Sequence, residues 1–312
     1  MEYADDNEYM YRSLFGESPP DPVTKPSEVN FQGLEELIPT LTNELMFPFP
    51  SVKLNTWQDF TRMTDGFRTR EFTILCGATG IGKTTLLANW SAQLHLQGEP
   101  HFIASVETGA TDFLRRVVSV LDQSNWNTGE KYSYERVTAM FKKHGDLLRT
   151  PGVWLSKYTN RAKVEDLIKD IKLAMELHKV KIAMIDNLNF FMEVTNAQNA
   201  LVEMDRVIHE LIIFCKEHDI HIIMVMHPRK MEGGRVESEF DIKGSSTAVQ
   251  EAHNVLLFNR PHPDFIQNGM ANQSDREITI AKMRRRGRYI GSKLILGTVD
   301  EVKYTEKKVW TL

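Results

Sequence analysis

An eight-residue segment, GATGIGKT, constrains the fold of this chain more than any other feature. It runs from Gly77 to Thr84 and has the spacing of a phosphate-binding loop: Gly, four residues, Gly, Lys, Thr. The six residues before it, EFTILC, are apolar or β-branched for the most part, as a buried parallel strand requires. The residues after it carry apolar side chains at helical spacing as far as Gly98. A strand, a glycine-rich turn and a helix in this order predict an α/β fold that binds a nucleotide.

The chemistry of the loop fits this prediction. Its glycines let the backbone curl so that N–H groups face phosphate oxygens, and the helix N-terminus adds its dipole. Lys83 can reach the β- and γ-phosphates, and Thr84 can offer its hydroxyl to Mg²⁺. A glycine-rich turn with an unrelated lysine is the alternative, but it does not account for the full pattern in its context. We expect a nucleoside triphosphate and Mg²⁺ to be bound by Gly77, Ala78, Thr79, Gly80, Ile81, Gly82, Lys83, Thr84 and Thr85.

Strands and helices are predicted to alternate from about residue 54. The expected strands are 71–76, 101–106, 181–185, 221–226, 254–258, 277–281 and 292–296, and the expected helices are 84–97, 111–122, 163–178 and 199–218. This alternation predicts a mostly parallel sheet covered on both faces. The last strands are separated by turns, which predicts an antiparallel extension at one edge. Ahead of this domain (54–312) we expect a flexible, acidic, proline-rich arm (1–30) and a linker helix region (31–53) bent or interrupted at Pro39.

Composition indicates an ordinary globular protein. The chain has 312 residues, of which 41% are hydrophobic and 26% charged. Its longest apolar run, IHIIMVM, is too short to cross a bilayer, and its N-terminus lacks the features of a signal or transit peptide. The two cysteines are expected to be buried and reduced, so the predicted compartment is the cytoplasm. The formal net charge of −4 does not indicate a nucleic-acid-binding protein, although KMRRRGR (282–288) concentrates five positive charges.

Three polar side chains follow predicted strands, at the sheet edge where α/β proteins bind ligands. Asp186 can hold Mg²⁺, although an aspartate at a strand end is often only a turn or helix cap. Glu107 can polarise the water that attacks the γ-phosphate, with a helix cap as its alternative role. His227 can sense the γ-phosphate, or it can satisfy local hydrogen bonds.

The long loop after His227 is basic at both ends and contains glycine. Loops of this length in compact domains are usually functional or disordered. Cations and backbone N–H groups bind a single-stranded phosphate backbone without reading its sequence. We therefore expect binding of single-stranded nucleic acid by Arg229, Lys230, Lys243, Gly244, Ser245 and Ser246.

Five segments then occur in the order found in one known family. They are NTWQDFTRMTDGFRTREFTILCGATGIGKTTLL, MIDNLNFFM, MHPRK, GSSTAVQEAHNVLLF and AKMRRRG. Together they resemble the replicative helicases of the DnaB superfamily over about residues 54–300. IDNLNFFM and HPRK are most similar to the Twinkle branch and its phage relatives.

The resemblance implies a RecA-like ATPase domain that assembles as a hexameric ring, with ATP bound between neighbours. Within it, Lys83, Thr84, Glu107 and Asp186 match the Walker lysine, magnesium-binding hydroxyl, catalytic glutamate and Walker B aspartate, and His227 matches a γ-phosphate sensor. Lys282 and Arg284 match a pair that reaches the neighbour's ATP, with Arg284 as arginine finger. Lys243, Gly244 and Ser246 match the channel loop that tracks DNA phosphates, Gln250 matches a glutamine near that loop, and Arg260 is expected to stack on the adenine.

The sequence departs from the family in two ways. His253 stands where the family often has aspartate, and no primase, zinc-binding or loader-binding domain precedes the ATPase core. We expect either a helicase domain cut from a longer protein or a stripped-down member. A fragment of a Twinkle-type protein would belong in the mitochondrial matrix.

The leading hypothesis is an ATP-dependent replicative DNA helicase that translocates on single-stranded DNA, by resemblance 5′ to 3′. Expected partners are single-stranded DNA, further copies of the chain and a primase, polymerase or loader, with no membrane. One alternative is a RecA- or RadA-like recombination ATPase, which HPRK and GSSTAVQEA disfavour. Another is a P-loop regulator that uses ATP only to change oligomeric state.

Overall fold

The computed structural model describes residues 16, 33–150, 152–158, 160–192, 199–229, 235–243 and 246–310. The chain divides into two compact units, Met1–Pro50 and Ser51–Leu312. In the first unit, helix α2 (Leu34–Met46) continues through Pro39, so the predicted interruption is wrong there. Pro39 removes only one backbone donor, and it lies early enough for the later turns to remain hydrogen-bonded.

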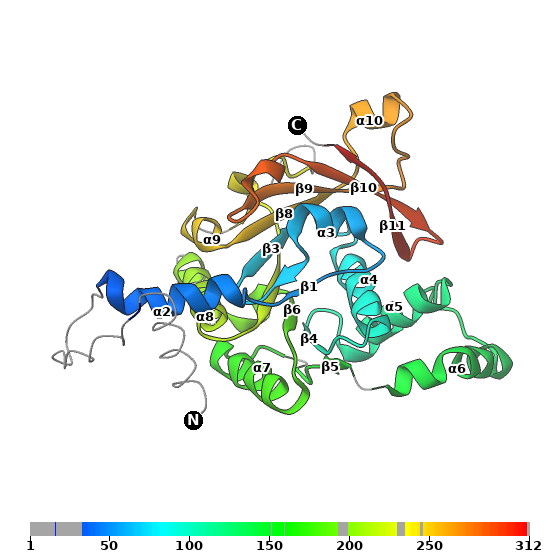
Figure 1. Ribbon diagram of the computed structural model, residues 1–312. Helices are drawn as coiled ribbons and strands as arrows, with labels where there is room; N and C mark the ends of the chain where they lie inside the picture. Colours follow the sequence, from blue (N-terminus) through cyan, green and yellow to red (C-terminus); the bar gives the residue numbers. More distant parts are fainter. Residues whose placement is uncertain are drawn as a thin grey trace. The chain divides into compact units, whose positions relative to one another are not determined.

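The second unit is built on a sheet with the strand order β11-β10-β9-β8-β3-β7-β6-β4-β5 (Figure 1). From β8 to β5 the neighbouring strands are parallel, whereas β9, β10 and β11 extend the sheet in antiparallel pairs. The α/β fold with a mostly parallel sheet and an antiparallel edge extension is therefore confirmed. The strands are β3 (Phe72–Cys76), β4 (His101–Ser105), β5 (Val153–Leu155), β6 (Ile182–Asp186), β7 (His221–Met226), β8 (Asn254–Asn259), β9 (Arg276–Met283), β10 (Lys293–Val299) and β11 (Lys303–Trp310), and β1 (Ser51–Val52) pairs with β2 (Phe67–Arg68).

Helices cover both faces of this sheet, because alternate residues of each central strand point to opposite sides. Ile74 and Cys76 pack in one apolar cluster with helices α7 and α8, while Leu75 packs in a second cluster with α3, α4 and α5. Both cysteines are buried and free, as predicted. The helices of this unit are α3 (Gln58–Thr64), α4 (Lys83–Leu96), α5 (Ala110–Asp122), α6 (Tyr134–Arg149), α7 (Val164–His178), α8 (Asn199–Glu217), α9 (Ser246–Glu251) and α10 (Pro263–Gln267), with short 3₁₀ turns η1 (Leu188–Phe191), η2 (Glu239–Asp241) and η3 (Gly287–Tyr289).

The strand order positions the predicted site. Strands β3, β7, β6 and β4 are neighbours and run in the same direction, so their carboxyl ends meet at one edge. The phosphate-binding loop follows β3, His227 follows β7, Asp186 ends β6, and Glu107 lies two residues beyond β4. Four separate segments therefore deliver their polar side chains to one place.

Candidate nucleotide-binding and catalytic site

The loop between β3 and α4 has the backbone geometry that its glycines suggest. Gly80 and Gly82 have φ values of 78° and 104°, a region that side chains with a Cβ atom disfavour. Gly82 is also the residue before the first turn of α4. At Gly77 a Cβ atom would collide with the backbone carbonyl of Phe258 on β8. The glycines are thus required by the turn and by close packing, independently of any ligand.

Lys83 is folded back over this loop. Its Nζ donates to the carbonyls of Gly77 and Ala78 at 2.7 and 2.9 Å, and it lies 3.4 Å from Nδ1 of His227. Only 6% of the residue is exposed, and burial lowers the pKa of its ammonium group. A cation held by two loop carbonyls at a helix N-terminus is placed to meet phosphate oxygens.

Asp186 and Thr84 provide oxygen donors beside the loop. The Thr84 hydroxyl donates to Oδ2 of Asp186 at 2.6 Å, and Asp186 is only 2% exposed. Burial raises the pKa of the Asp186 carboxyl, because the charged form is poorly solvated. Within the described residues no cluster of three or more His, Cys, Asp or Glu could hold a metal ion. One hydroxyl and one carboxylate fit Mg²⁺, which usually takes few protein ligands and fills its octahedron with phosphates and water.

Glu107 and His227 meet at a third residue, Asn187. The Asn187 amide donates a hydrogen bond to Oε2 of Glu107, and its nitrogen lies 3.2 Å from Nε2 of His227. Glu107 is not the N-cap of α5: that position is Gly109, and no side-chain hydrogen bond caps the helix. The capping alternative for Glu107 therefore lacks support in this structure. Burial, followed by the charge of Lys83, lowers the pKa of His227 and favours the neutral ring.

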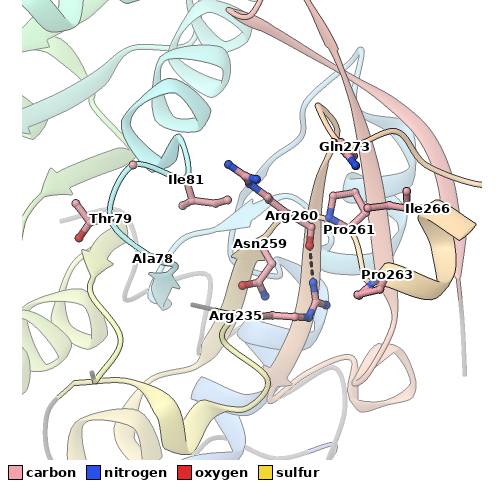
Figure 2. Close-up of a pocket in the computed structure, with 11 residues that line it drawn as sticks. Ala78, Thr79, Ile81, Arg235, Asn259, Arg260, Pro261, Pro263, Ile266 and Gln273 are labelled. Carbon is pink, nitrogen blue, oxygen red and sulfur yellow. Dashed lines mark hydrogen bonds between the residues drawn. The ribbon is translucent and has the colours of Figure 1, made fainter. Parts of the chain in front are cut away.

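A cavity of about 570 Å³ adjoins the phosphate-binding loop (Figure 2). Ala78 to Ile81 line one side, and Arg260, which follows β8, lines the other. Arg235 also lines the cavity and donates to the Arg260 carbonyl, while its second Nη atom lies 2.5 Å from the fully buried carboxylate of Glu277. The cavity thus has an apolar and cationic lining next to the phosphate site, which suits an aromatic base.

The predicted DNA-binding residues are described only in part. Lys230, Gly244 and Ser245 lie outside the described residues, and Ser246 is the first residue of α9. Lys243 is exposed, and its backbone N–H donates to the carbonyl of His227 at 3.0 Å. The Arg229 guanidinium donates to the carbonyl of Ile242 at 3.2 Å. The two ends of the described loop are therefore held together, directly beyond the histidine.

Arg284 lies at the amino ends of the parallel strands, away from the phosphate-binding loop of its own chain, and Lys282 lies two residues before it on β9. The Arg284 backbone N–H donates to the carbonyl of His253, just ahead of β8, whereas the phosphate-binding loop follows the far end of the neighbouring strand β3. At about 3.3 Å per strand residue, the Arg284 backbone lies roughly 15–20 Å from the phosphate-binding loop. This is further than an arginine side chain extends.

The side chains of this pair contact helix α9 instead. Lys282 Nζ donates to the carbonyls of Val249 and Gln250 at 2.9 and 2.6 Å. Arg284 donates to the carbonyls of Gln250 and Glu251 at 2.7 and 3.1 Å. Cations at a helix C-terminus satisfy its last carbonyls and oppose its dipole. His253, the departure from the family pattern, accepts from the Phe72 backbone N–H, and its pKa is lowered to about 4 by burial and then by Arg284.

Sequence reasoning missed several side chains at the site. Asn187 is the most central of them, and its only signal is its place directly after Asp186 at a strand end. Arg276 donates to the Ile81 carbonyl at 2.8 Å, and Arg116 approaches the Thr85 hydroxyl at 3.5 Å. Both come from elements distant in sequence, which no local motif reveals.

The DnaB-like helicase C-terminal domain model matches residues 54–296, more than half of the chain. The chain belongs to the DnaB-like helicase C-terminal domain family. Two solved structures share this fold: a DnaB-like replicative helicase, described with its interactions with primase, and an isolated ATPase domain. The replicative helicase has a TM-score of 0.71 at 14% identity, and the match covers 91% of this chain and 69% of the helicase. The ATPase domain has a TM-score of 0.69 at 13% identity, and the match covers 89% of this chain and 100% of that domain.

Family membership indicates the reaction that this enzyme catalyses. A member of the DnaB-like helicase family with this RecA-like fold is an ATP-hydrolysing replicative helicase, so the chain binds a nucleotide. Among the described residues no helix has the length and apolarity needed to cross a membrane.

Proposed function

We propose that this enzyme works as a hexameric ring of identical protomers that moves along single-stranded DNA from 5′ to 3′ and separates the duplex ahead of it. The observation that carries the proposal is the position of Arg284. It lies at the amino ends of the parallel strands, whereas its own phosphate-binding loop lies at their carboxyl ends. It can therefore act on ATP only when the ATP is bound to the loop of a second protomer. A repeated head-to-tail contact of this kind closes into a ring or continues as a filament.

In the proposed mechanism, ATP binds with Mg²⁺ at the loop. The ion, held through Thr84 and Asp186, would neutralise charge on the phosphates. Lys83 contacts the terminal phosphates, and Arg260 stacks on the base in the adjoining cavity. Glu107 positions the attacking water, since this residue is exposed just beyond the end of β4 and water can reach it. The neighbour's Lys282 and Arg284 stabilise the charge on the transferred phosphoryl group.

DNA binding is proposed for the loop from Arg229 to Ser246. Lys243 is an exposed cation whose backbone is hydrogen-bonded to His227, so the segment that would touch DNA is continuous with the segment that would touch γ-phosphate. Loss of the phosphate can therefore shift the loop. The arm (1–30) and linker region (31–53) remain proposed divisions of the chain. A primase, polymerase or loader is proposed as a partner in the cytoplasm of a bacterial or phage-infected cell, or in the mitochondrial matrix if the chain is part of a Twinkle-type protein.

A forked substrate tests the proposal against recombination. With ATP and Mg²⁺, the chain is expected to release the strand of a fork that carries a free 5′ single-stranded tail, and not to exchange homologous strands. Strand exchange without unwinding would instead support a RecA-like filament. Hydrolysis that DNA does not stimulate, without unwinding, would support the regulator.

A further inference from the structure

Asn187 occupies the centre of the catalytic edge, between three segments. It follows Asp186 at the end of β6, and it is only 4% exposed. Its Oδ1 atom accepts the backbone N–H of Asn189 at 3.1 Å. Its Nδ2 atom faces both Oε2 of Glu107 and Nε2 of His227.

These contacts fix the orientation of the amide. A backbone N–H can only donate, so the atom that faces Asn189 must be the oxygen. The NH₂ group then faces the other way, and its two hydrogens are sufficient for one bond to the carboxylate and one to the imidazole.

The amide also determines which nitrogen of His227 carries the proton. Because Nε2 accepts from Asn187, a neutral ring must hold its proton on Nδ1. Nδ1 lies 3.5 Å from the Thr79 hydroxyl, which can accept this proton, and 3.4 Å from the Lys83 ammonium, which donates to the carbonyls of Gly77 and Ala78 instead. Since the lysine of such a loop reaches the β- and γ-phosphates, an N–H at this position can donate to the same phosphate oxygens.

We propose that Asn187 is a positioning residue for ATP hydrolysis, whose single amide both orients the carboxylate of Glu107 and sets the tautomer of His227. Because both side chains are bonded to the Asn187 amide, contact between His227 and the γ-phosphate is coupled to the orientation of the Glu107 carboxylate, which positions water. The inference rests on the proposed roles of Glu107 and His227.

A simpler role for Asn187 is to cap η1 through Oδ1, since its side chain already accepts from the Asn189 N–H. Two substitutions separate the roles. Asn187→Asp keeps an acceptor for that N–H but turns the donor side into a second carboxylate facing Glu107. Asn187→Ser also keeps a capping oxygen but is too short to reach Glu107 and His227. Asn189→Ala is the matched control, because the Asn189 side chain is exposed and only its backbone takes part.

The experiment measures steady-state ATP hydrolysis and binding of a fluorescent ATP analogue for the full chain. We expect kcat to fall about 10²-fold in both Asn187 variants, as for other losses of alignment, with the affinity for the analogue unchanged and Asn189→Ala at the parent rate. In ¹⁵N spectra of histidine-labelled protein, the His227 proton should lie on Nδ1 in the parent and move to Nε2 in Asn187→Asp.

Parent kcat in both variants, or an unchanged tautomer in Asn187→Asp, would overturn the inference and leave only the cap. Glu107→Gln distinguishes this from failure of the proposed function. If Glu107→Gln abolishes turnover while the Asn187 variants remain active, only the positioning role is wrong. If Glu107→Gln is itself fully active, the assignment of Glu107 is wrong and the inference falls with it.

Discussion

Two carboxylates end neighbouring strands of the sheet, and their surroundings give them different tasks. Ser105 on β4 pairs with Asp186 on β6, so Glu107 and Asp186 lie close together. Asp186 is buried against the Thr84 hydroxyl, a position that suits a cation and excludes bulk water. Glu107 is exposed, and the Asn187 amide donates to its carboxylate, so one side of that group is held while water can reach the other.

Glu107→Gln is therefore expected to slow hydrolysis by at least about 10²-fold while ATP binding is retained, since general-base groups contribute roughly 10²–10⁴-fold. Gln keeps an oxygen that can accept from Asn187, so the fold should be undisturbed. The measurement is kcat beside the dissociation constant of an ATP analogue. Weak binding with normal turnover at saturation would contradict the role and point to a structural one.

At the scale of elements, hydrophobic pattern predicted the buried strands well. All seven expected strands are present with small shifts at their ends, because β3, β6 and β7 are continuous apolar runs that only a buried strand explains. Two strands of the large sheet were not predicted. Strand β11 is charged along its length and only partly buried at one sheet edge, and β5 is a three-residue strand at the other edge, so neither has that pattern. Helix α6 was missed because it buries little against the main core. Its Met140 is buried in a small separate cluster around Trp126, with Val137 and Leu148 packed against it.

Only the part of the candidate site that lies at strand ends could be predicted from the sequence. The order of the parallel strands brings Glu107, Asp186 and His227 together independently of the conformation of the loops. The bond from Asn187 to two of them, and the contacts of Lys282 and Arg284 with α9, depend on the course of turns that have no periodic signal.

The loop after β7 is held by backbone contacts, which predicts the effect of Lys243→Ala. The Lys243 N–H bond to His227 and the bridge between Pro228 and Ile242 involve no side-chain atom of Lys243. Basal hydrolysis should therefore stay near the parent rate, while stimulation by single-stranded DNA falls. The salt dependence of DNA binding should become shallower by about one phosphate contact per protomer. Lys172→Ala, an exposed lysine on α7, is the control, and an unchanged slope for Lys243→Ala would place DNA binding elsewhere.

At the scale of the whole molecule, two buried histidines make the fold sensitive to acid. His101 accepts from Ser91 and donates to the Glu99 carbonyl, while His221 accepts from Thr73 and donates to the Arg68 carbonyl. Both are fully buried, and burial lowers the pKa of each to about 4. The unfolded chain, with histidine pKa values near 6.5, binds more protons between these values. Folding is therefore favoured fully above about pH 6.5 and is weakened as the pH falls towards 4.

We expect the free energy of unfolding to fall by about 3 kcal/mol per histidine over this range, from 1.36 kcal/mol per pKa unit. Urea unfolding at several pH values measures the slope. Replacing His221 with Gln, which can still form both kinds of hydrogen bond, should lower stability at pH 7 yet flatten its decline between pH 6.5 and 4. An unchanged slope in His221→Gln would show that this histidine does not titrate on unfolding.

In the proposed ATP site, the phosphate-binding loop and Arg284 come together only when protomers assemble. Each protomer carries a phosphate-binding loop at the carboxyl ends of its parallel strands and Arg284 at their amino ends. The proposed complete site therefore needs the loop of one copy and the arginine of the next. An arginine supplied in this way is worth on the order of 10³–10⁵ in rate, because its planar, permanently charged group can meet two oxygens at once. Arg284→Ala and Lys83→Ala are each expected to lose hydrolysis, and Arg284→Ala should keep ATP binding. Arg288→Ala, an exposed arginine stacked on Tyr289, is the control and should stay active.

Mixing the two inactive variants tests the division directly. In a randomly mixed ring, about a quarter of the head-to-tail interfaces join an intact loop from an Arg284→Ala protomer to an intact arginine from a Lys83→Ala protomer. Hydrolysis should reappear at those interfaces, rising and falling with the mixing ratio and greatest near equal amounts. Native mass spectrometry establishes that mixed rings form. Mixed rings that hydrolyse no ATP would refute the action of Arg284 on its neighbour, since every other part of the site is present at those interfaces.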